Sequence, residues 1–372
     1  MKTLFFRHRA DILSEPHVQQ LQRSWPDQSI LVDGRCSEWR DGTRVSTRSF
    51  VRSRVAESQL RLMLWSAAHE RLVKDYCPDV IVAHTTMDGL RMSRIARRLD
   101  IPLAIICHGS DVLASAEQMR QISFSGRQLT SRWPTLIRDT SMFVTVSDYV
   151  KLILERRIGS SPHPPIVRHY LGTDAWKSYS DTSRRERDLL FVGRLRPNKG
   201  PHIFVDIVKQ VVASGLDVSA TIVGDGSMLE HLTTYVHDQG LTEQIQFLGA
   251  LPQDEVFRVM GQHRLIIVPS QQIDGGVSEG LGLASLEAQA VGTPAIVSST
   301  GGLPETVIEG ATGEIASTVQ QFADLSIGLL ADSDRWFLYS NSAQTHITTD
   351  FNRNLQTPKL YALLHDLVSN RS

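Results

Sequence analysis

Two glutamates frame a short stretch with two glycines, EGLGLASLE, in the second half of the chain. Glu279 and Glu287 stand eight positions apart. On an α-helix this spacing corresponds to about 12 Å of rise and roughly 80° of rotation, so the two carboxylates cannot contact one small ligand group. They are suited instead to accept hydrogen bonds from hydroxyl groups at the two ends of an extended ligand.

The stretch between these glutamates is suited to bind an anion. It follows the β-rich run RLIIVPS, and we predict a helix that begins near Gly280 to Gly282, with Ser278 as a candidate cap. The free amides and the dipole of a helix start favour phosphate oxygens. The amides concerned are those of Gly280, Leu281, Gly282 and Leu283. Because carboxylates repel phosphate, Glu279 and Glu287 must point past it toward neutral hydroxyls. A nucleotide-sugar has this layout, and surface glutamates on an amphipathic helix are the alternative interpretation.

A second candidate anion site follows an earlier β-rich run. FVGRLRPNKG places Gly193, Arg194, Lys199 and Gly200 in a loop that ends where a helical pattern begins. Glycine lets a backbone approach a ligand closely, and two cations at a helix start can neutralise a diphosphate. An ordinary solvated turn is the alternative interpretation.

Short β-rich runs alternate with helical periodicity twice over, which is typical of parallel α/β sheets. The runs are TLFF, SILVD, DVIVAHT, PLAIICHG and MFVTVSD, then LLFVGRL, SATIVGDG, IQFLGAL, RLIIVPS and PAIVSS. We predict two doubly wound, Rossmann-like α/β domains facing a central cleft, with ligands at the carboxyl ends of the strands. The polar, aperiodic stretch at 179–188 indicates a linker, so we place the boundary near 172–188 and the domains at 1–175 and 186–350.

The composition is that of a soluble globular protein. Of 372 residues, 41% are apolar and 21% are charged, and the formal net charge is -1. This profile argues against a disordered protein and against a nucleic-acid partner. Residues 1–172 carry 25 Lys and Arg against 17 Asp and Glu, whereas the remainder carries 14 against 23. The two halves therefore have opposite net charges.

Cys36, Cys77 and Cys107 lie far apart and outside any CxxC spacing, which predicts neither disulfides nor a zinc site. We expect all three to be buried core thiols in a reducing cytoplasm. The first residues lack a signal-peptide core, and no stretch of about 18 uninterrupted apolar residues occurs, so neither export nor a membrane span is predicted.

The motifs, in this order, resemble those of the retaining glycosyltransferases of family 4, which have the two-domain GT-B fold. EGLGLASLEAQAVGTPAIVSSTGG resembles the family's E-x7-E segment, and FVGRLRPNKG resembles its phosphate loop. TIVGDG and IQFLGAL stand where the family builds its nucleotide pocket. VIVAHTTMDGLRMSRIARRLDIPLAIICHGSDV resembles the middle of the first domain, so the resemblance covers most of the chain.

The resemblance implies roles for individual residues. Arg194 and Lys199 would hold the donor diphosphate, Glu279 would accept from donor-sugar hydroxyls, and Glu287 would accept from the ribose. His108, in CHGSD, matches a family histidine that faces the donor sugar and the acceptor. The candidate catalytic residues are thus His108, Arg194, Lys199 and Glu279. The candidate donor-binding residues are Gly193, Gly224, Gly280, Leu281, Gly282, Leu283 and Glu287. The family also returns its last helix to the first domain, so about 352–372 is expected to pack there.

No DxD pair occurs at the end of an expected strand, so a metal clamp is not required, and we expect a reaction without metal or cofactor. The resemblance implies the course of that reaction. The donor is a nucleotide-diphosphate sugar, attack occurs on the front face, and the departing phosphate takes the proton of the acceptor. The acceptor would be a saccharide or a lipid-linked saccharide in cell-surface polysaccharide or glycoconjugate synthesis. One feature departs from the family pattern: RHRADILSEPH lacks the Gly-Gly pair that reaches the donor phosphates in many members, and Arg7, Arg9 and His17 stand in its place.

Several other functions were weighed. A sugar-nucleotide epimerase of the same architecture lacks the spaced glutamates, and a phosphorylase needs a pyridoxal lysine that no residue here matches. A dinucleotide dehydrogenase requires GxGxxG, whereas VGDGSM lacks the third glycine. A non-catalytic sugar-nucleotide-binding protein is a further alternative, one that is normally exported.

A cluster of arginines in the basic first half suggests a peripheral membrane contact at the inner face of the cell membrane. Arg91, Arg94, Arg97 and Arg98 stand beside Met92, Ile95 and Leu99. Such a face can dock on anionic lipid, and a merely solvated face is the alternative.

Overall fold

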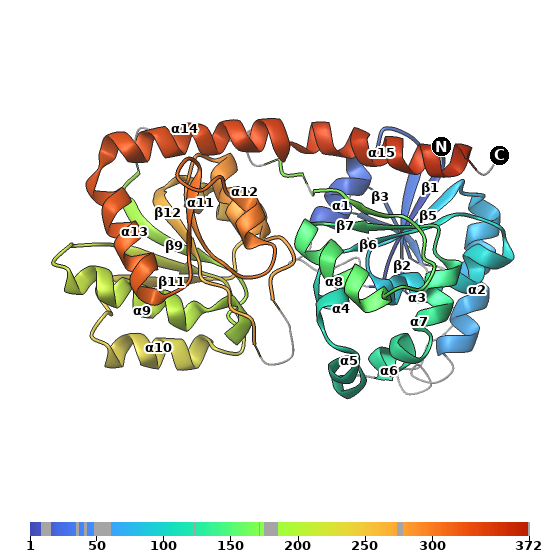
Figure 1. Ribbon diagram of the computed structural model, residues 1–372, viewed down its shortest axis with the longest axis horizontal. Coiled ribbons are helices and arrows are strands. Elements are labelled where there is room, and N and C mark those ends of the chain that lie inside the picture. Colours follow the sequence, from blue (N-terminus) through green and yellow to red (C-terminus); the bar gives the residue numbers. More distant parts are fainter. Residues whose placement is uncertain are drawn as a thin grey trace. The chain divides into compact units, whose positions relative to one another are not determined.

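The computed structural model divides the chain into two compact units. The residues described are 1–8, 16–34, 37–40, 43–47, 61–122, 124–170, 172–174, 185–273 and 278–370. Unit 1 comprises Met1–Leu171 and Arg353–Ser372, and unit 2 comprises Gly172–Asn352 (Figure 1). Each unit has its own sheet.

Unit 1 is built on a mostly parallel sheet with the strand order β4-β3-β2-β1-β5-β6-β7-β8. Its strands are β1 (Thr3–Arg7), β2 (Ser29–Asp33), β3 (Ser37–Arg40), β4 (Thr43–Thr47), β5 (Val80–Ala83), β6 (Leu103–Cys107), β7 (Met142–Thr145) and β8 (Ile166–Arg168). Strand β3 pairs antiparallel with β2 and with β4. The chain order reverses between the neighbours β1 and β5, and doubly wound sheets bind ligands beyond the carboxyl ends of their strands at such a reversal.

Helices cover both faces of this sheet (Figure 1). They are α1 (Pro16–Arg23), α2 (Arg61–Tyr76), α3 (Thr86–Arg98), α4 (Ser110–Leu113), α5 (Ala116–Ile122), α6 (Phe124–Ser131), α7 (Trp133–Asp139), α8 (Asp148–Ile158) and α15 (Arg353–Ser369). With helices on both faces, the central strands must be continuous apolar runs, and all five residues of β6, LAIIC, are buried.

The last helix of the chain, α15, packs on unit 1. The Arg353 guanidinium donates to Gln20 Oε1 of α1 at 2.7 Å. The Tyr361 hydroxyl donates to Asp27 Oδ2 at 3.0 Å, and the Tyr361 ring lies edge-on to Trp25 with the centroids 5.5 Å apart. Unit 1 is therefore assembled from both ends of the chain.

Unit 2 is built on a wholly parallel sheet with the strand order β11-β10-β9-β12-β13-β14. Its strands are β9 (Arg187–Val192), β10 (Ala220–Val223), β11 (Ile245–Gly249), β12 (His263–Val268), β13 (Ala295–Ser298) and β14 (Gly313–Ala316). Counted within the unit, this is the 3-2-1-4-5-6 order of a dinucleotide-binding fold, and the reversal lies between β9 and β12.

The helices of unit 2 form one layer on each face of the sheet. They are α9 (Pro201–Ala213), α10 (Leu229–Asp238), α11 (Gln253–Gly261), α12 (Leu283–Ala290), α13 (Val319–Ala331) and α14 (Ser333–Asp350), with short 3-10 turns at Pro197–Lys199 and Leu303–Thr306. Helices α9, α10 and α13 pack together on one face, while α11, α12 and α14 pack together on the other (Figure 1). The core between α9, α13 and the strands is apolar, with Phe204, Val208 and Phe322 buried in it.

The fold class predicted from the sequence is confirmed: both units are doubly wound α/β domains. Each of the ten expected strands is present, whereas β3, β4, β8 and β14 were not expected. Strand β8 has only three residues, and β14, GEIA, begins with a glycine and a glutamate, so neither forms an apolar run that stands out in the sequence.

No helix in the described part of the chain is both long enough and apolar enough to cross a bilayer.

The prediction that all three cysteines are core thiols is wrong for Cys77. This residue directly follows α2, with a backbone φ of 50°, and its side chain is exposed. Cys107 ends β6 and is buried, as expected. Cys36 lies outside the described residues.

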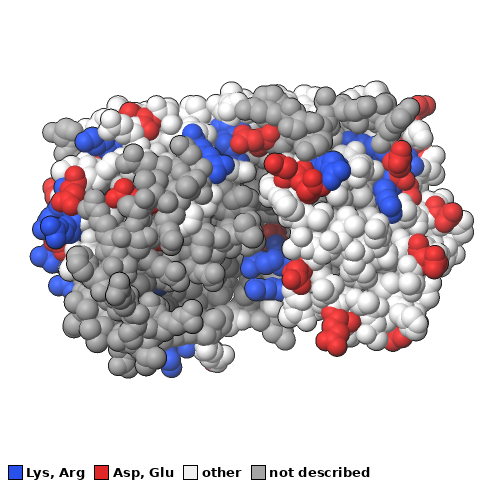
Figure 2. Space-filling model, turned by 180° about the vertical axis from the view of Figure 1, so that it is seen from behind, with Lys and Arg blue, Asp and Glu red and all other residues white. Residues whose placement is uncertain are grey.

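Of the three apolar residues that stand beside the arginines of α3, Leu99 is half-buried and the other two are withdrawn from the surface, and the membrane contact stays a prediction. Met92 and Ile95 are buried toward the sheet. Arg97 and Arg98 lie within 4.0 Å and 3.2 Å of carboxylate oxygens of Asp139 and Glu70. On the face shown in Figure 2, basic and acidic side chains of the described residues are intermingled in the same way. Further arginines surround Leu60 to Trp65 in the sequence, and the side chains of that stretch lie outside those that the structure describes.

Candidate functional site

The sheet reversal in unit 2 brings Lys199 and Glu279 together. Lys199 lies in the loop after β9 and Glu279 in the loop after β12, and Lys199 Nζ donates to Glu279 Oε2. Ser270 Oγ also donates to Oε2, at 3.4 Å. The two charged side chains are 25% and 15% exposed, so the pair is partly shielded from water. Glu279 Oε1 makes no hydrogen bond with any described residue and is open to a ligand.

Glycines allow the loops beside this pair to approach one another closely. Gly193 N donates to Val223 O at 3.0 Å, and Gly224 N donates to Gly249 O at 2.8 Å. Gly224 has a φ of +138°, and a Cβ there would stand 1.9 Å from the carbonyl oxygen of Gly193. Arg194, in the same loop, is exposed and forms no ion pair within the described residues. The backbones of these loops thus lie close together, and the Arg194 side chain in one of them is exposed.

The backbone of Glu279 is held by the turn after β13. Gly302 N donates to Glu279 O at 2.9 Å. Gly301 has a φ of +65°, and a Cβ there would stand 2.2 Å from the same carbonyl oxygen. The Glu279 side chain is thus positioned by residues more than twenty positions further along the chain.

Helix α12 begins at Leu283, one to three residues later than expected, because Gly282 adopts a left-handed conformation with a φ of 96°. Glu279 therefore lies before the helix and Glu287 lies within it, where Gln253 Nε2 donates to Glu287 Oε1 at 2.9 Å. The two glutamates have different hydrogen-bond partners within the protein. Gly280, Leu281 and Gly282 form the buried bend between them.

In unit 1, three histidines gather at the carboxyl edge of the sheet. His84 directly follows β5 and His108 directly follows β6, and His84 Nδ1 lies 3.3 Å from His108 Nε2. His17, from α1, lies over the His108 ring with the centroids 4.8 Å apart. Burial, reinforced by nearby histidines and by Arg7, holds the pKa values of His84 and His108 well below the ordinary range. These rings are neutral at pH 7.

Beside the histidines, Asp88 fixes the end of β1. Its carboxylate accepts from Arg7 Nη1 at 3.0 Å, from His8 N at 3.1 Å and from Thr85 Oγ1 at 2.8 Å. Arg91 Nη1 lies 3.7 Å from the same carboxylate. Arg7 and His17 thus stand at the sheet reversal of unit 1, whereas Arg9 lies outside the described residues.

The neutral histidines make stability depend on pH. Desolvation lowers the pKa of His17 from 6.5 to about 3, with Arg7 contributing. In the unfolded chain this ring binds a proton below about pH 6.5, whereas in the folded chain it does not until about pH 3. The free energy of unfolding should therefore fall by about 1.4 kcal/mol per pH unit for each such histidine as the pH drops below 6.5.

Chemical denaturation from pH 7 to pH 5 measures this dependence. His17→Phe should reduce the slope by about 1.4 kcal/mol per pH unit, and the same change at the exposed His237 should leave it unaltered. Equal slopes for the wild type and His17→Phe would contradict the prediction.

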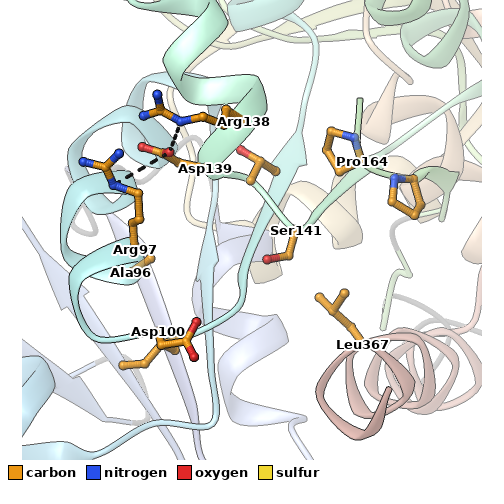
Figure 3. A pocket seen from close by; sticks show the side chains of 11 residues that line it. Ala96, Arg97, Asp100, Arg138, Asp139, Ser141, Pro164 and Leu367 are labelled. Atoms are coloured by element: carbon orange, nitrogen blue, oxygen red, sulfur yellow. Dashed lines mark hydrogen bonds and ion pairs between the residues drawn. The ribbon is translucent and has the colours of Figure 1, made fainter. Parts of the chain in front are cut away.

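A cavity of about 590 Å³ lies elsewhere in unit 1, at the amino ends of β6, β7 and β8. Figure 3 shows that Arg97 and Arg138 turn toward Asp139, leaving Asp100, Ser141 and Leu367 around the open space. Because ligands of doubly wound sheets bind at the opposite edge, we do not assign the candidate site to this cavity.

The model of the family described as glycosyl transferases group 1 matches residues 173–344, and that of glycosyltransferase family 4 matches residues 14–175. The chain belongs to the group 1 glycosyltransferases of family 4, and its fold is the GT-B fold.

Two relatives illustrate the likeness in sequence. A GDP-mannose-dependent phosphatidylinositol monomannoside mannosyltransferase of Corynebacterium glutamicum is 32% identical over 46% of this chain and 45% of its own. A glycogen synthase of Mycobacterium tuberculosis is 24% identical over 75% of this chain and 66% of its own. The chain thus spans less than two thirds of the length of either relative.

Two solved structures share the fold. The Anabaena protein HepE, solved in complex with UDP and glucose, has a TM-score of 0.78 at 19% identity and covers 98% of this chain, which covers 100% of HepE. A sucrose-phosphate synthase from Thermosynechococcus elongatus has a TM-score of 0.78 at 15% identity, with full coverage of both chains.

Proposed function

We propose that this chain is a retaining, metal-independent hexosyltransferase that uses a nucleotide-diphosphate sugar as its donor. The observation that carries the proposal is the Lys199–Glu279 pair, which lies beside exposed Arg194 at the carboxyl ends of β9 and β12. A cation at this place can neutralise a diphosphate, while the open Oε1 of Glu279 accepts from a sugar hydroxyl. Glu287 is the acceptor for the ribose diol.

The names of similar proteins support this class of donor. The corynebacterial relative is named for GDP-mannose, and HepE was solved with UDP and glucose. HepE was also solved with UDP-glucose, and GDP-mannose and UDP-glucose are both hexoses activated by a nucleoside diphosphate. The acceptor is, by the same reasoning, a saccharide or a lipid-linked saccharide in the synthesis of a surface polysaccharide or glycoconjugate.

The chemistry that we propose uses no protein nucleophile. The bond between the anomeric carbon and the diphosphate oxygen breaks while the acceptor oxygen bonds to the same face of the sugar. The acceptor proton passes to the departing phosphate oxygen. Arg194 and Lys199 stabilise the charge that develops on that phosphate, which is why a metal ion is not needed. His108 contacts the bound sugar.

Thermal denaturation with UDP-, GDP- and ADP-sugars tests the donor site. The matching donor at about 100 times its dissociation constant should stabilise the protein by about 2.7 kcal/mol, and Lys199→Met should abolish the stabilisation. With that donor, the rate of transfer should be the same with and without EDTA. No stabilisation by any of these donors would overturn the proposal.

A further inference from the structure

The contact between His84 and His108 has the geometry of a hydrogen bond in the plane of both rings. The rings lie 17° from parallel, with centroids 5.5 Å apart and the facing nitrogens 3.3 Å apart. The centroid distance exceeds the nitrogen distance by about two ring radii, so His84 Nδ1 and His108 Nε2 lie between the ring centres. Face-to-face stacking would bring the centroids closer than this.

A hydrogen bond between two neutral imidazoles couples their tautomers. One nitrogen must carry the proton and the other must accept it. If His84 donates from Nδ1, His108 carries its own proton on Nδ1. If His108 donates from Nε2, His84 accepts at Nδ1 and carries its single ring proton on Nε2.

The surroundings of His84 distinguish the two arrangements. Its side chain is buried next to the Phe5 ring, and Nε2 has no hydrogen-bond partner among the described residues. A buried N–H without an acceptor is rarer in proteins than an unused lone pair. The arrangement in which Nε2 of His84 is unprotonated is therefore favoured, and His84 is the donor.

The remaining nitrogen of His108 is the one that a ligand can reach. Nδ1 of His108 has no hydrogen-bond partner in the described part of the chain. Unlike Nε2 of His84, it is not fully buried. The backbone beside it is pinned, because Asp111 accepts from Gly109 N at 3.3 Å and from Thr86 N at 2.6 Å. An Nδ1–H group held in this way can only donate.

We propose that His84 is a positioning residue that fixes His108 as an Nδ1–H hydrogen-bond donor to a hydroxyl oxygen of the bound sugar. This inference rests on the proposed function for the identity of the ligand, but the tautomer itself does not depend on it. His108 then orients the sugar and does not act as a general base, in keeping with a reaction in which the leaving phosphate takes the proton.

Nitrogen NMR of protein labelled with ¹⁵N-histidine tests the tautomer without an activity assay. Two-bond ¹H–¹⁵N correlations distinguish the Nδ1–H and Nε2–H forms, and the His108 signals are identified by their loss in His108→Gln. We expect the Nδ1–H form in the wild type. An Nε2–H form would overturn the proposal and leave the transferase function untouched.

Two variants test the role of His84. The amide of His84→Asn places an N–H group near the position of Nδ1 and should retain the Nδ1–H form of His108. His84→Leu removes the donor and should give a mixture of tautomers, with turnover lowered about tenfold or more and the donor KM nearly unchanged. A pure Nδ1–H form in His84→Leu would overturn the proposal. If His84→Leu does not fold, the wild-type and His84→Asn spectra decide.

Discussion

Lys199→Met is expected to lower the rate of glycosyl transfer by about 100- to 1,000-fold, the usual cost of removing one group that stabilises developing charge. The methionine keeps the length of the side chain but cannot neutralise the departing diphosphate. It also leaves the Glu279 carboxylate without its cation, although Ser270 still donates to it. Steady-state kinetics with the donor found by thermal denaturation measure the effect.

Lys209→Met is the matched control for this substitution. Lys209 lies on α9, near the same loop in sequence, and its ammonium donates to the exposed Gln239 amide oxygen. Losing that contact should leave the turnover rate within about twofold of the wild-type rate, because exposed polar pairs contribute little to stability. A Lys199→Met protein that melts like the wild type and turns over at the wild-type rate would refute the assignment of the donor site.

Gly301→Ala is expected to have the second large effect, on both stability and activity. A methyl group at this position would meet the Glu279 carbonyl oxygen at 2.2 Å, and the φ of +65° already disfavours an L-residue. Together these terms should cost about 2–5 kcal/mol of unfolding free energy. Relief of the clash must displace the Glu279 backbone, and a displacement of about 1 Å at a reacting group lowers activity by about 100-fold.

Gly240→Ala separates the cost of the positive φ from the cost of the steric clash with Glu279. Gly240 has nearly the same φ, +69°, but a Cβ there would have no atom within 4 Å. It should lose about 1 kcal/mol from the backbone conformation alone and keep full activity. Denaturant titrations and kcat/KM for both variants measure the difference. Equal losses at Gly301 and Gly240 would show that contact with Glu279 is unimportant.

The fold was predictable because buried parallel strands are continuous apolar runs. IIC of β6 and TIV of β10 can only be accommodated between two layers of helices, and the alternation with helical segments gives the doubly wound arrangement. Strands β3 and β4 were not predictable in this way, because SEWR and TRVST are polar and lie at the edge of a sheet.

The individual residues of the candidate site could be predicted from the sequence, but the contact between Lys199 and Glu279 could not. Lys199 and Glu279 each follow an expected strand, which indicates the edge at which they lie. That β9 and β12 are neighbours is a property of the strand order, and the sequence does not contain it in any local pattern. The direct contact between the ammonium and the carboxylate therefore appears only in the structure.

His84 was missed for a different reason. His84 directly follows the apolar strand VIVA, just as His108 directly follows LAIIC. This shared position at a strand end was the only feature of the sequence that could have indicated a role for His84. A lone histidine after a strand is usually structural. His84 meets His108 because β5 and β6 are neighbouring strands, paired with Ala83 opposite Ile105.

The return of α15 to unit 1 has a consequence for how the protein is made. Unit 2 is one continuous segment, whereas the contacts of unit 1 at Gln20, Trp25 and Asp27 are completed only by residues from Arg353 onward. On the ribosome, the later-encoded half can complete its core first, while the earlier half waits for the final helix to emerge. The part of the protein that is synthesised first is thus the last to be finished.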